Sequence, residues 1–244
     1  MAKRKILLLH TRHDPWIDFL SEYFEETQSA VFNFHEGSSA KIWFEKNRPE
    51  IVFCDPSLLT RPFVSSLEIA RNASQPPLMF GTGGRPSPLR ARFDGLFSDP
   101  SGIFDFQREL MRSLPFAPKL RVLIVDDDPE IGRMICDFFE RRVHPVFETI
   151  HFQDAREGFS CLLSEVPDVL ILDIKMPGMD GREFYCGMRA RGLDVPTIVF
   201  FDSVFGEELA EMRRAGKPAV IEKGSVRSTL PELIELTRKV SFFS

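Results

Sequence analysis

The sequence predicts an α/β protein in which two doubly wound parallel-sheet domains, each of the (βα)5 type, follow one another in tandem. Short, continuously apolar segments alternate with helical segments along the chain, which indicates parallel sheets covered by helices on both faces. The same order of elements occurs twice, because the segment that ends at Asp55 matches the segment that ends at Asp173. The length of 244 residues also suits two domains of about 120 residues each.

Five strands and a well-marked helix are expected in the second half. The strands lie at residues 121–125, 145–150, 168–173, 197–201 and 219–222. Residues 128–142 read as a helix, in which Asp128 is the N-cap and Pro129 occupies the first helical position. A second helix is expected after the turn residues Pro177 and Gly178, where Asp180 and Glu183 have the spacing of a capping box.

The first half repeats this order of elements. Its strands are expected at residues 5–10, 30–34, 50–56, 77–81 and 94–97. Helices are expected after the Asp14-Pro15 pair and around residues 39–47. The proline-containing segment near residues 113–120 reads as a short linker, so the predicted domains are residues 1–116 and 120–244.

The composition narrows the classes of protein to consider. An apolar content of 43% and a charged content of 27% are ordinary for a soluble globular protein. The net charge of -5 argues against a nucleic-acid partner, and the chain has no apolar run long enough for a membrane span. The four cysteines show neither a Cys-x-x-Cys spacing nor a disulfide framework, so we expect a reduced, cytoplasmic protein.

Three aspartates and a lysine are expected to meet at one edge of the second sheet. Asp126 and Asp127 end its first strand, Asp173 ends the third, and Lys223 ends the last. Functional residues of doubly wound sheets gather at the carboxyl ends of the strands. Three adjacent carboxylates need a counterion, and their oxygen atoms suit Mg2+ where a phosphate also binds. The metal would draw a phosphoryl donor towards an aspartate nucleophile, and Lys223 would neutralise a phosphoryl oxygen.

These residues carry a family resemblance. The segments "VLIVDDDPE" and "DVLILDIKMPGMDG", with the later Glu222-Lys223 pair, resemble the receiver domain of bacterial two-component response regulators over residues 120–240. The resemblance implies a flavodoxin-like (CheY-like) fold in which Asp173 accepts a phosphoryl group from a histidine kinase or a phosphotransfer protein. It also implies that Asp127, Asp173 and the backbone carbonyl of Lys175 ligate Mg2+, with Asp126 acting through water and Lys223 contacting the phosphoryl group.

The chain departs from the family pattern at the residues that transmit activation. The position of the usual Thr or Ser at the end of the fourth strand holds Phe201, and the usual aromatic residue three before the lysine is Val220. The proline that normally follows the lysine is Gly224. We therefore expect phosphorylation without the usual hydroxyl–aromatic relay; Ser203 could replace the missing hydroxyl if the strand bulges.

The first half is predicted to be a degenerate copy, or pseudo-receiver. His10 to His13 occupy the region of the acid pair, while Asp55 stands at the acceptor position and Thr82 at the switch hydroxyl. The lysine position falls on Asp99. We expect this copy to bind Mg2+ poorly, to leave Asp55 unmodified and to serve protein interaction. We interpret His10 and His13 as solvated loop residues rather than as metal ligands.

Three functions are consistent with these patterns. The first is a phosphorelay response regulator that is not an enzyme, has no DNA-binding or catalytic output domain, and signals to a downstream protein partner; a homodimer is a further candidate assembly. The second is a tandem-receiver scaffold that is never phosphorylated. The third is a haloacid-dehalogenase-type phosphatase, in which Asp126 would be the nucleophile and Asp128 the general acid. Against it, Glu130 stands where that family has Thr or Val, and the later acidic pair is missing.

Overall fold

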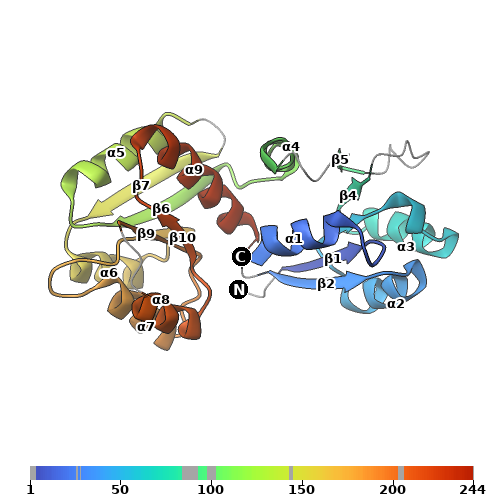
Figure 1. The fold of residues 1–244 in the computed structure, drawn as a ribbon, viewed down its shortest axis with the longest axis horizontal. Helices are drawn as coiled ribbons and strands as arrows, with labels where there is room; N and C mark the ends of the chain where they lie inside the picture. Colours follow the sequence, from blue (N-terminus) through green and yellow to red (C-terminus); the bar gives the residue numbers. More distant parts are fainter. Residues whose placement is uncertain are drawn as a thin grey trace. The chain divides into compact units, whose positions relative to one another are not determined.

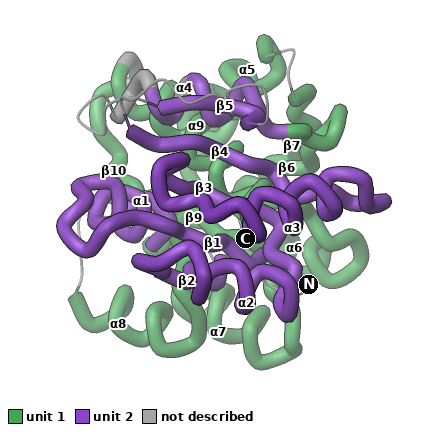
Figure 2. Tube along the Cα trace, turned by 90° about the vertical axis from the view of Figure 1, so that its right-hand side faces the viewer, with its two compact units in different colours: residues 1, 26–28, 115–244 green, residues 2–25, 29–114 purple. Residues whose placement is uncertain are grey.

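The protein is described from a computed structural model, which divides into two compact units (Figure 2). One unit contains Ala2–Glu25 and Ser29–Leu114, and the other contains Pro115–Ser244. The residues whose structure is described are 4–25, 27, 29–83, 93–97, 103–142, 145–202 and 206–243. Within these residues, no helix combines the length and the apolar character that crossing a bilayer requires.

The first unit is a parallel sheet with helices packed against it (Figure 1). Its strands are β1 (Lys5–Leu9), β2 (Ala30–Phe34), β3 (Ile51–Cys54), β4 (Leu78–Thr82) and β5 (Gly95–Phe97). Its helices are α1 (Pro15–Glu25), α2 (Gly37–Asn47), the 3-10 turn η1 (Pro56–Leu58), α3 (Arg61–Arg71) and α4 (Ile103–Ser113). The strands lie in the order β2-β1-β3-β4-β5, which is the flavodoxin-like order.

The second unit repeats this topology. Its strands are β6 (Lys119–Val125), β7 (Val146–Phe152), β8 (Val169–Leu172), β9 (Thr197–Phe201) and β10 (Ala219–Glu222). Its helices are α5 (Pro129–Glu140), α6 (Ala155–Ser164), α7 (Gly181–Ala190), α8 (Gly206–Ala215) and α9 (Val226–Phe243). The sheet order β10-β9-β8-β6-β7, read from the β7 edge, is the order of the first unit. The predicted fold class, two flavodoxin-like α/β domains, is confirmed.

The second sheet is covered on both faces because side chains alternate along each strand. On β6, Val122 and Ile124 join a core cluster with residues of α5 and α9. Leu123 and Val125 join a second cluster, with residues of α6, α7 and α8. β8 is buried along its whole length, as expected for a central parallel strand between two helical layers.

The start of β6 differs from the sequence prediction. The strand begins at Lys119, inside the segment predicted to be a linker, because Lys119 and Leu120 pair in register with Val146 and Phe147 of β7. Phe116 of that segment is also packed, since its ring lies 5.5 Å from that of Phe242 on α9. The alternation of exposed and buried residues at the start of β6 resembles loop composition and hides the strand from a search for apolar runs.

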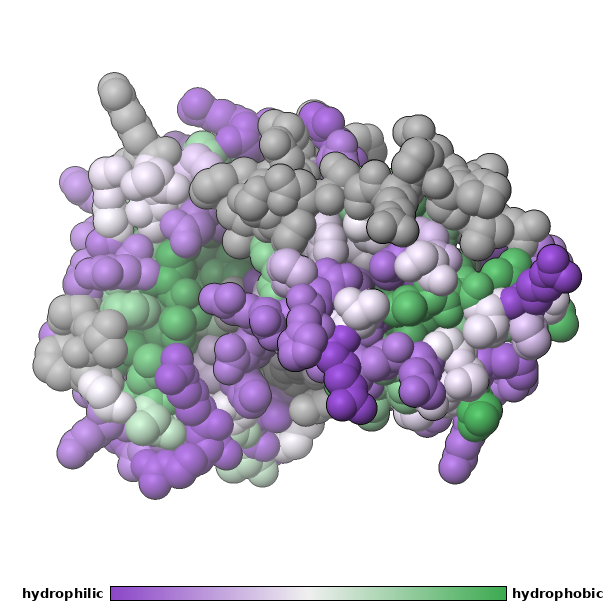
Figure 3. All heavy atoms as spheres, turned by 45° about the vertical axis from the view of Figure 1, so that its right-hand side comes forward, coloured by the Kyte–Doolittle hydropathy of each residue, from purple (hydrophilic) through white to green (hydrophobic). Residues whose placement is uncertain are grey.

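On the face drawn in Figure 3, apolar groups lie between hydrophilic ones. Exposed large apolar side chains occur in both units: Phe32, Ile42 and Ile69 in the first, and Val146, Ile150, Leu163 and Val166 in the second. The apolar groups in the second unit lie on the edge strand β7, on α6 and just after α6.

Candidate functional site

The carboxyl ends of three strands bring the predicted site residues together. Asp126 and Asp127 follow β6 directly, Asp173 follows β8, and Lys223 follows β10. β6 and β8 are neighbours in the sheet, and β9 separates β8 from β10. Because all of these strands are parallel, their carboxyl ends face the same edge.

Lys223 lies between two of the carboxylates. Its Nζ is 3.0 Å from Oδ2 of Asp126 and 2.9 Å from Oδ1 of Asp173. Both aspartates are buried, with 1% and 4% of their surface exposed. Asp202, which is exposed, places its Oδ2 3.9 Å from the same Nζ. The lysine therefore provides the countercharge that the sequence analysis assigned to a metal alone.

Asp126, Asp127 and Asp173, called here the acid cluster, could also hold a metal ion. One carboxylate oxygen from each lies within 4.8 Å of the other two. Asp127 is exposed whereas its two partners are buried, so the cluster is reachable from solvent. A set of carboxylate oxygens is the donor type that a hard cation such as Mg2+ prefers, so the residues present fit that ion.

Burial and charge shift the pKa values of the central pair. Burial raises the pKa of Asp173; the hydrogen bond and charge of Lys223 oppose this rise, and the charge of Asp126 adds to it. Burial alone would lower the pKa of Lys223, but its bonds to Asp173 and Asp126 raise it overall. Both pKa values are raised because one ammonium is shared by two carboxylates. Two negative neighbours favour the charged form of Lys223, whereas half of one positive neighbour offsets only part of the burial of Asp173.

The loop after β6 is built from local hydrogen bonds. Asp128 caps α5, since its Oδ1 accepts from the backbone N–H of Glu130 at 2.8 Å and of Ile131 at 3.3 Å. The N–H of Asp128 in turn donates to Oδ1 of Asp126 at 3.0 Å. The three consecutive aspartates thus have different surroundings: Asp126 is buried beside Lys223, Asp127 is open, and Asp128 is a helix cap.

The loop after β8 is held close to Asp173. The predicted capping box is present, with the N–H of Glu183 donating to Oδ1 of Asp180 and the N–H of Asp180 donating to Oε2 of Glu183. Gly181 is required by a close approach, because a Cβ there would lie 2.1 Å from the carbonyl oxygen of Asp173. Lys175 lies within this loop and is exposed.

The positions of the usual switch residues are apolar and packed. Phe201 is buried in the core between the sheet and helices α6 to α8, and Val220 packs against the same cluster. β9 pairs with β10 in unbroken register up to Phe201 and Glu222, so this stretch has no bulge. Ser203 lies outside the described residues. Gly224 donates its N–H to Oγ1 of Thr229 at 3.2 Å.

At the corresponding edge of the first unit, a histidine replaces the acid pair. Our interpretation of His10 as solvated is wrong: it follows β1 directly and is fully buried. Its Nδ1 lies 3.2 Å from Oδ2 of Asp14 and 3.4 Å from Oγ1 of the buried Thr82. His10 is buried because it stands at the edge position that Asp126 has in the second sheet. His13 is exposed, as predicted.

Asp55 is close to this histidine in the first unit but has a local role as well. It caps η1, with Oδ1 accepting from the N–H of Ser57 at 2.8 Å. Burial lowers the pKa of His10, and the charges of Asp14 and Asp55 partly oppose that effect. Asp99, expected at the lysine position, lies outside the described residues.

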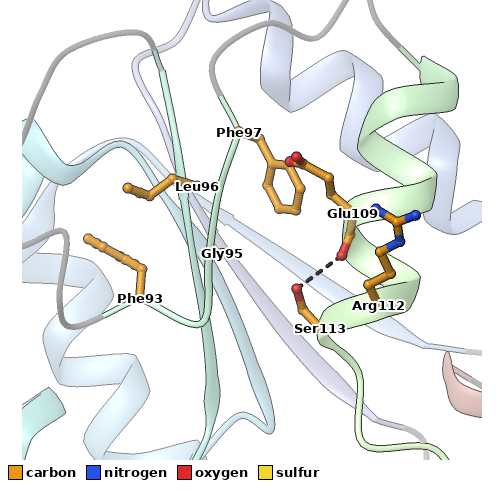
Figure 4. A pocket seen from close by; sticks show the side chains of 7 residues that line it. All are labelled: Phe93, Gly95, Leu96, Phe97, Glu109, Arg112 and Ser113. Carbon is orange, nitrogen blue, oxygen red and sulfur yellow. Dashed lines mark hydrogen bonds between the residues drawn. The ribbon is translucent and has the colours of Figure 1, made fainter.

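A cavity of about 420 Å3 lies elsewhere in the first unit (Figure 4). It is lined from β5 and its approach by Phe93, Gly95, Leu96 and Phe97, and from α4 by Glu109, Arg112 and Ser113. Within the pocket wall, the Ser113 hydroxyl donates to the backbone oxygen of Glu109. None of the strand-end residues His10, Asp55 or Thr82 contributes to this lining.

Sequence reasoning missed one residue beside the acid cluster, His151 on β7. Its Nε2 is 2.8 Å from the backbone oxygen of Asp126. The signal for His151 in the sequence was indirect, because it was only a glycine, Gly132, inside a predicted helix, where glycine is unfavourable. In the structure, the ring of His151 occupies the space that a side chain at residue 132 would need.

Comparisons with known proteins give the second unit a family. The protein-family model of the response regulator receiver domain matches residues 122–235. A nitrate/nitrite response regulator protein homolog of Haemophilus influenzae is 32% identical over 118 residues, which are 48% of this chain and 56% of that protein. A protein-glutamate methylesterase/protein-glutamine glutaminase of Clostridium acetobutylicum is 34% identical over 34% of this chain and 24% of its own length.

Solved structures include similar receiver domains. The response regulator domain of Thermotoga maritima CheB is 24% identical, covers 50% of this chain and 96% of its own, and has a TM-score of 0.45. The chain spans about half the length of the first curated relative and a quarter of the second. Residues 122–235, which include the whole acid cluster and Lys223, therefore match the response regulator receiver domain.

Proposed function

We propose that the second unit is the phosphoacceptor of a two-component phosphorelay and that Asp173 receives the phosphoryl group. The observation that carries this proposal is the position of Lys223 Nζ, 2.9 Å from Oδ1 of Asp173 and 3.0 Å from Oδ2 of Asp126, beside the solvent-accessible Asp127. A buried carboxylate with an adjacent ammonium can accept a phosphoryl group whose oxygens that ammonium then neutralises.

Asp173 and Lys223 have the direct roles in the phosphoryl transfer. A carboxylate oxygen of Asp173 forms the new bond to phosphorus, while the bond from phosphorus to the donor histidine nitrogen breaks and leaves its electron pair on that nitrogen. Lys223 exchanges a carboxylate partner for a phosphoryl oxygen. Asp126, Asp127, Asp173 and the Lys175 carbonyl would hold Mg2+, with Asp126 acting through water as the family resemblance implies. The ion supplies charge neutralisation of the phosphoryl oxygens when bound.

The expected partners follow from this chemistry. The donor is a histidine kinase or a phosphotransfer protein, and output passes through contacts with a downstream protein or with a second copy of the chain. The first unit would be a pseudo-receiver. This is supported by the buried His10 at the acid position and by the engagement of Asp55 as the cap of η1.

Phosphodonor labelling tests the proposal. The full chain is incubated with acetyl phosphate and Mg2+, and any acyl phosphate is located by mass spectrometry. We expect label on Asp173 that disappears in Asp173→Asn and persists in Asp55→Asn, the matched change at the first unit's acceptor position. Label on Asp55 in the native chain would contradict the pseudo-receiver assignment.

The same measurement distinguishes the two other functions. A scaffold that is never phosphorylated predicts no label; it is favoured by the apolar Phe201 and Val220 at the switch positions. A haloacid-dehalogenase-type phosphatase predicts label on Asp126. The structure gives that alternative little support, because its general acid would be Asp128, whose carboxylate already caps α5.

A further inference from the structure

His151 attaches the residue that opens the acid cluster to the neighbouring strand. A carbonyl oxygen only accepts hydrogen bonds, so Nε2 of His151 carries the hydrogen that it donates to the Asp126 carbonyl at 2.8 Å. The N–H of Asp126 donates to the carbonyl of Phe152 at 3.1 Å. Both backbone polar groups of Asp126 are therefore bonded to β7, although β6 has ended at Val125.

The ring of His151 reaches this position because residue 132 is a glycine. A Cβ at Gly132 would lie 2.1 to 2.3 Å from the Cε1, Nδ1 and Nε2 atoms of the ring. Glycine inside a helix is unfavourable relative to alanine, so Gly132 weakens helix α5. In return, the imidazole packs directly against the backbone of α5, next to the loop that carries Asp126 and Asp127.

With these bonds, Asp126 is held at all four of its polar groups. Its N–H and C=O bond to β7, its Oδ1 accepts from the N–H of Asp128, and its Oδ2 pairs with Lys223. The peptide that His151 binds is the one joining Asp126 to Asp127. Rotation of that peptide would turn the Asp127 carboxylate away from the acid cluster, so the bond from His151 opposes that movement.

The first unit contains the same pair of bonds without the acid pair. The N–H of His10 donates to the carbonyl of Phe34 at 3.0 Å, and Nδ1 of His35 lies 2.9 Å from the carbonyl of His10. His35 follows β2, whereas His151 lies within β7, so the two histidines reach the same carbonyl from different positions. The bond thus has a geometric role that needs no neighbouring acid, and His35 provides a natural control.

We propose that His151, seated against Gly132, is a positioning residue for the acid cluster, and that its N–H holds the Asp126–Asp127 peptide in the orientation that binds Mg2+. This inference rests on the proposed function of the second unit. Partners that orient metal ligands without touching the metal commonly change affinity by about 10- to 100-fold when they are removed.

The test compares His151→Phe, which keeps a ring but loses the donor, with His151→Gln, whose side-chain amide donates at a similar reach. The Mg2+ concentration at half-saturation is measured on the full chain from amide NMR shifts of Asp127 and Asp128. We expect His151→Phe to raise it about tenfold or more, His151→Gln to stay within about threefold of the native chain, and Gly132→Ala to resemble His151→Phe.

His35→Phe is the matched control, because it removes the equivalent bond in the unit that lacks the acid pair. It should leave the half-saturation concentration unchanged. The inference is overturned if His151→Phe binds Mg2+ like the native chain, or if His35→Phe weakens binding equally. Failure of the proposed function looks different: the native chain itself would show no Mg2+-dependent shifts at these amides and no label on Asp173. Should His151→Phe fail to fold, Gly132→Ala and His151→Gln test the inference instead. It is then overturned if Gly132→Ala binds Mg2+ like the native chain.

Discussion

At the scale of single residues, Lys223 shows how one cation can make a cluster of acids compatible with a folded core. Its Nζ contacts both buried carboxylates of the acid cluster. Removing the lysine would leave both buried carboxylates without this countercharge, and breaking a buried ion pair in this way costs about 3–5 kcal/mol. Asp173 is nevertheless the less well compensated partner, because burial and Asp126 raise its pKa against the effect of Lys223.

Asp173→Asn should therefore stabilise the protein at neutral pH. A carboxyl group whose pKa is raised in the folded state contributes stability below its unfolded value of 3.8, and this contribution is lost as pH rises through the folded pKa. At a pH above the folded pKa the native chain has lost this contribution, whereas the asparagine variant has no carboxyl group to ionise. We expect the Tm of the second unit, measured by calorimetry, to rise by about 4 °C for each kcal/mol gained. The gain should shrink as pH falls through the raised pKa; a constant difference at all pH values would contradict this account.

The buried His10 should give the stability of the first unit the opposite pH dependence. Burial lowers its pKa from the ordinary 6.5, so its contribution to stability is fully present above 6.5 and is lost as pH falls through the lower, folded pKa. The fluorescence of Trp16 and Trp43, which both lie in this unit, reports its unfolding separately. We expect the fluorescence Tm to fall by several degrees between pH 7.5 and pH 5.5, and His10→Gln to lose most of that dependence. An equal fall in the variant would assign the effect to other groups.

At the scale of elements, the three aspartates between β6 and α5 have different roles, because one caps the helix and two belong to the acid cluster. Asp128 accepts two N–H groups at the start of the helix, whereas Asp127 makes no part of the cap. Capping depends on a side-chain acceptor next to the first turn, and metal binding depends on a side chain directed towards the strand ends.

The two roles can be separated by substitution. Asp128→Ala should lower the free energy of unfolding by about 1 kcal/mol, because two helical N–H groups lose their acceptor, and it should leave the Mg2+ half-saturation concentration almost unchanged. Asp127→Asn should do the reverse, weakening Mg2+ binding with little loss of stability, since Asp127 is exposed. Urea unfolding and the NMR titration measure the two quantities. If Asp128→Ala weakened Mg2+ binding more than Asp127→Asn, the division of roles would be wrong.

At the scale of the whole molecule, the same five-stranded order is built twice from sequences that keep different side chains at the strand ends. The strand pairings of each sheet are made within one unit. We propose, as the sequence analysis predicted, that residues 1–116 and 120–244 are separate domains.

Expression of the second half by itself tests this proposal. A chain starting at Pro115 keeps all of β6 and the contact between Phe116 and Phe242. We expect this fragment to unfold cooperatively, with a Tm within about 5 °C of the Tm of the second unit in the full chain. It should also be labelled on Asp173 by the phosphodonor. A chain starting at Arg121 removes the first two residues of β6 and should be less stable. Loss of cooperative unfolding in the longer fragment would show that the units depend on each other.

The sequence by itself determined the fold class and the meeting of Asp126, Asp127, Asp173 and Lys223. Parallel strands joined by helices must place their carboxyl ends at one edge, so a residue that directly follows an apolar strand can be assigned to that edge without knowing its contacts. The helix caps at Asp128 and Asp180 were predictable for a similar reason, since they depend only on residues within four positions of each other.

The tertiary structure alone decided which side chains touch. Lys223 pairs with two acids at once, His10 is buried rather than solvated, and His151 reaches the Asp126 carbonyl past Gly132. Each contact joins residues from different strands or from a strand and a helix, and its length depends on sheet register and side-chain rotamer. Periodicity in a sequence reports which face a residue occupies, but it contains no information about the register between strands, and register places an imidazole next to one carbonyl instead of another.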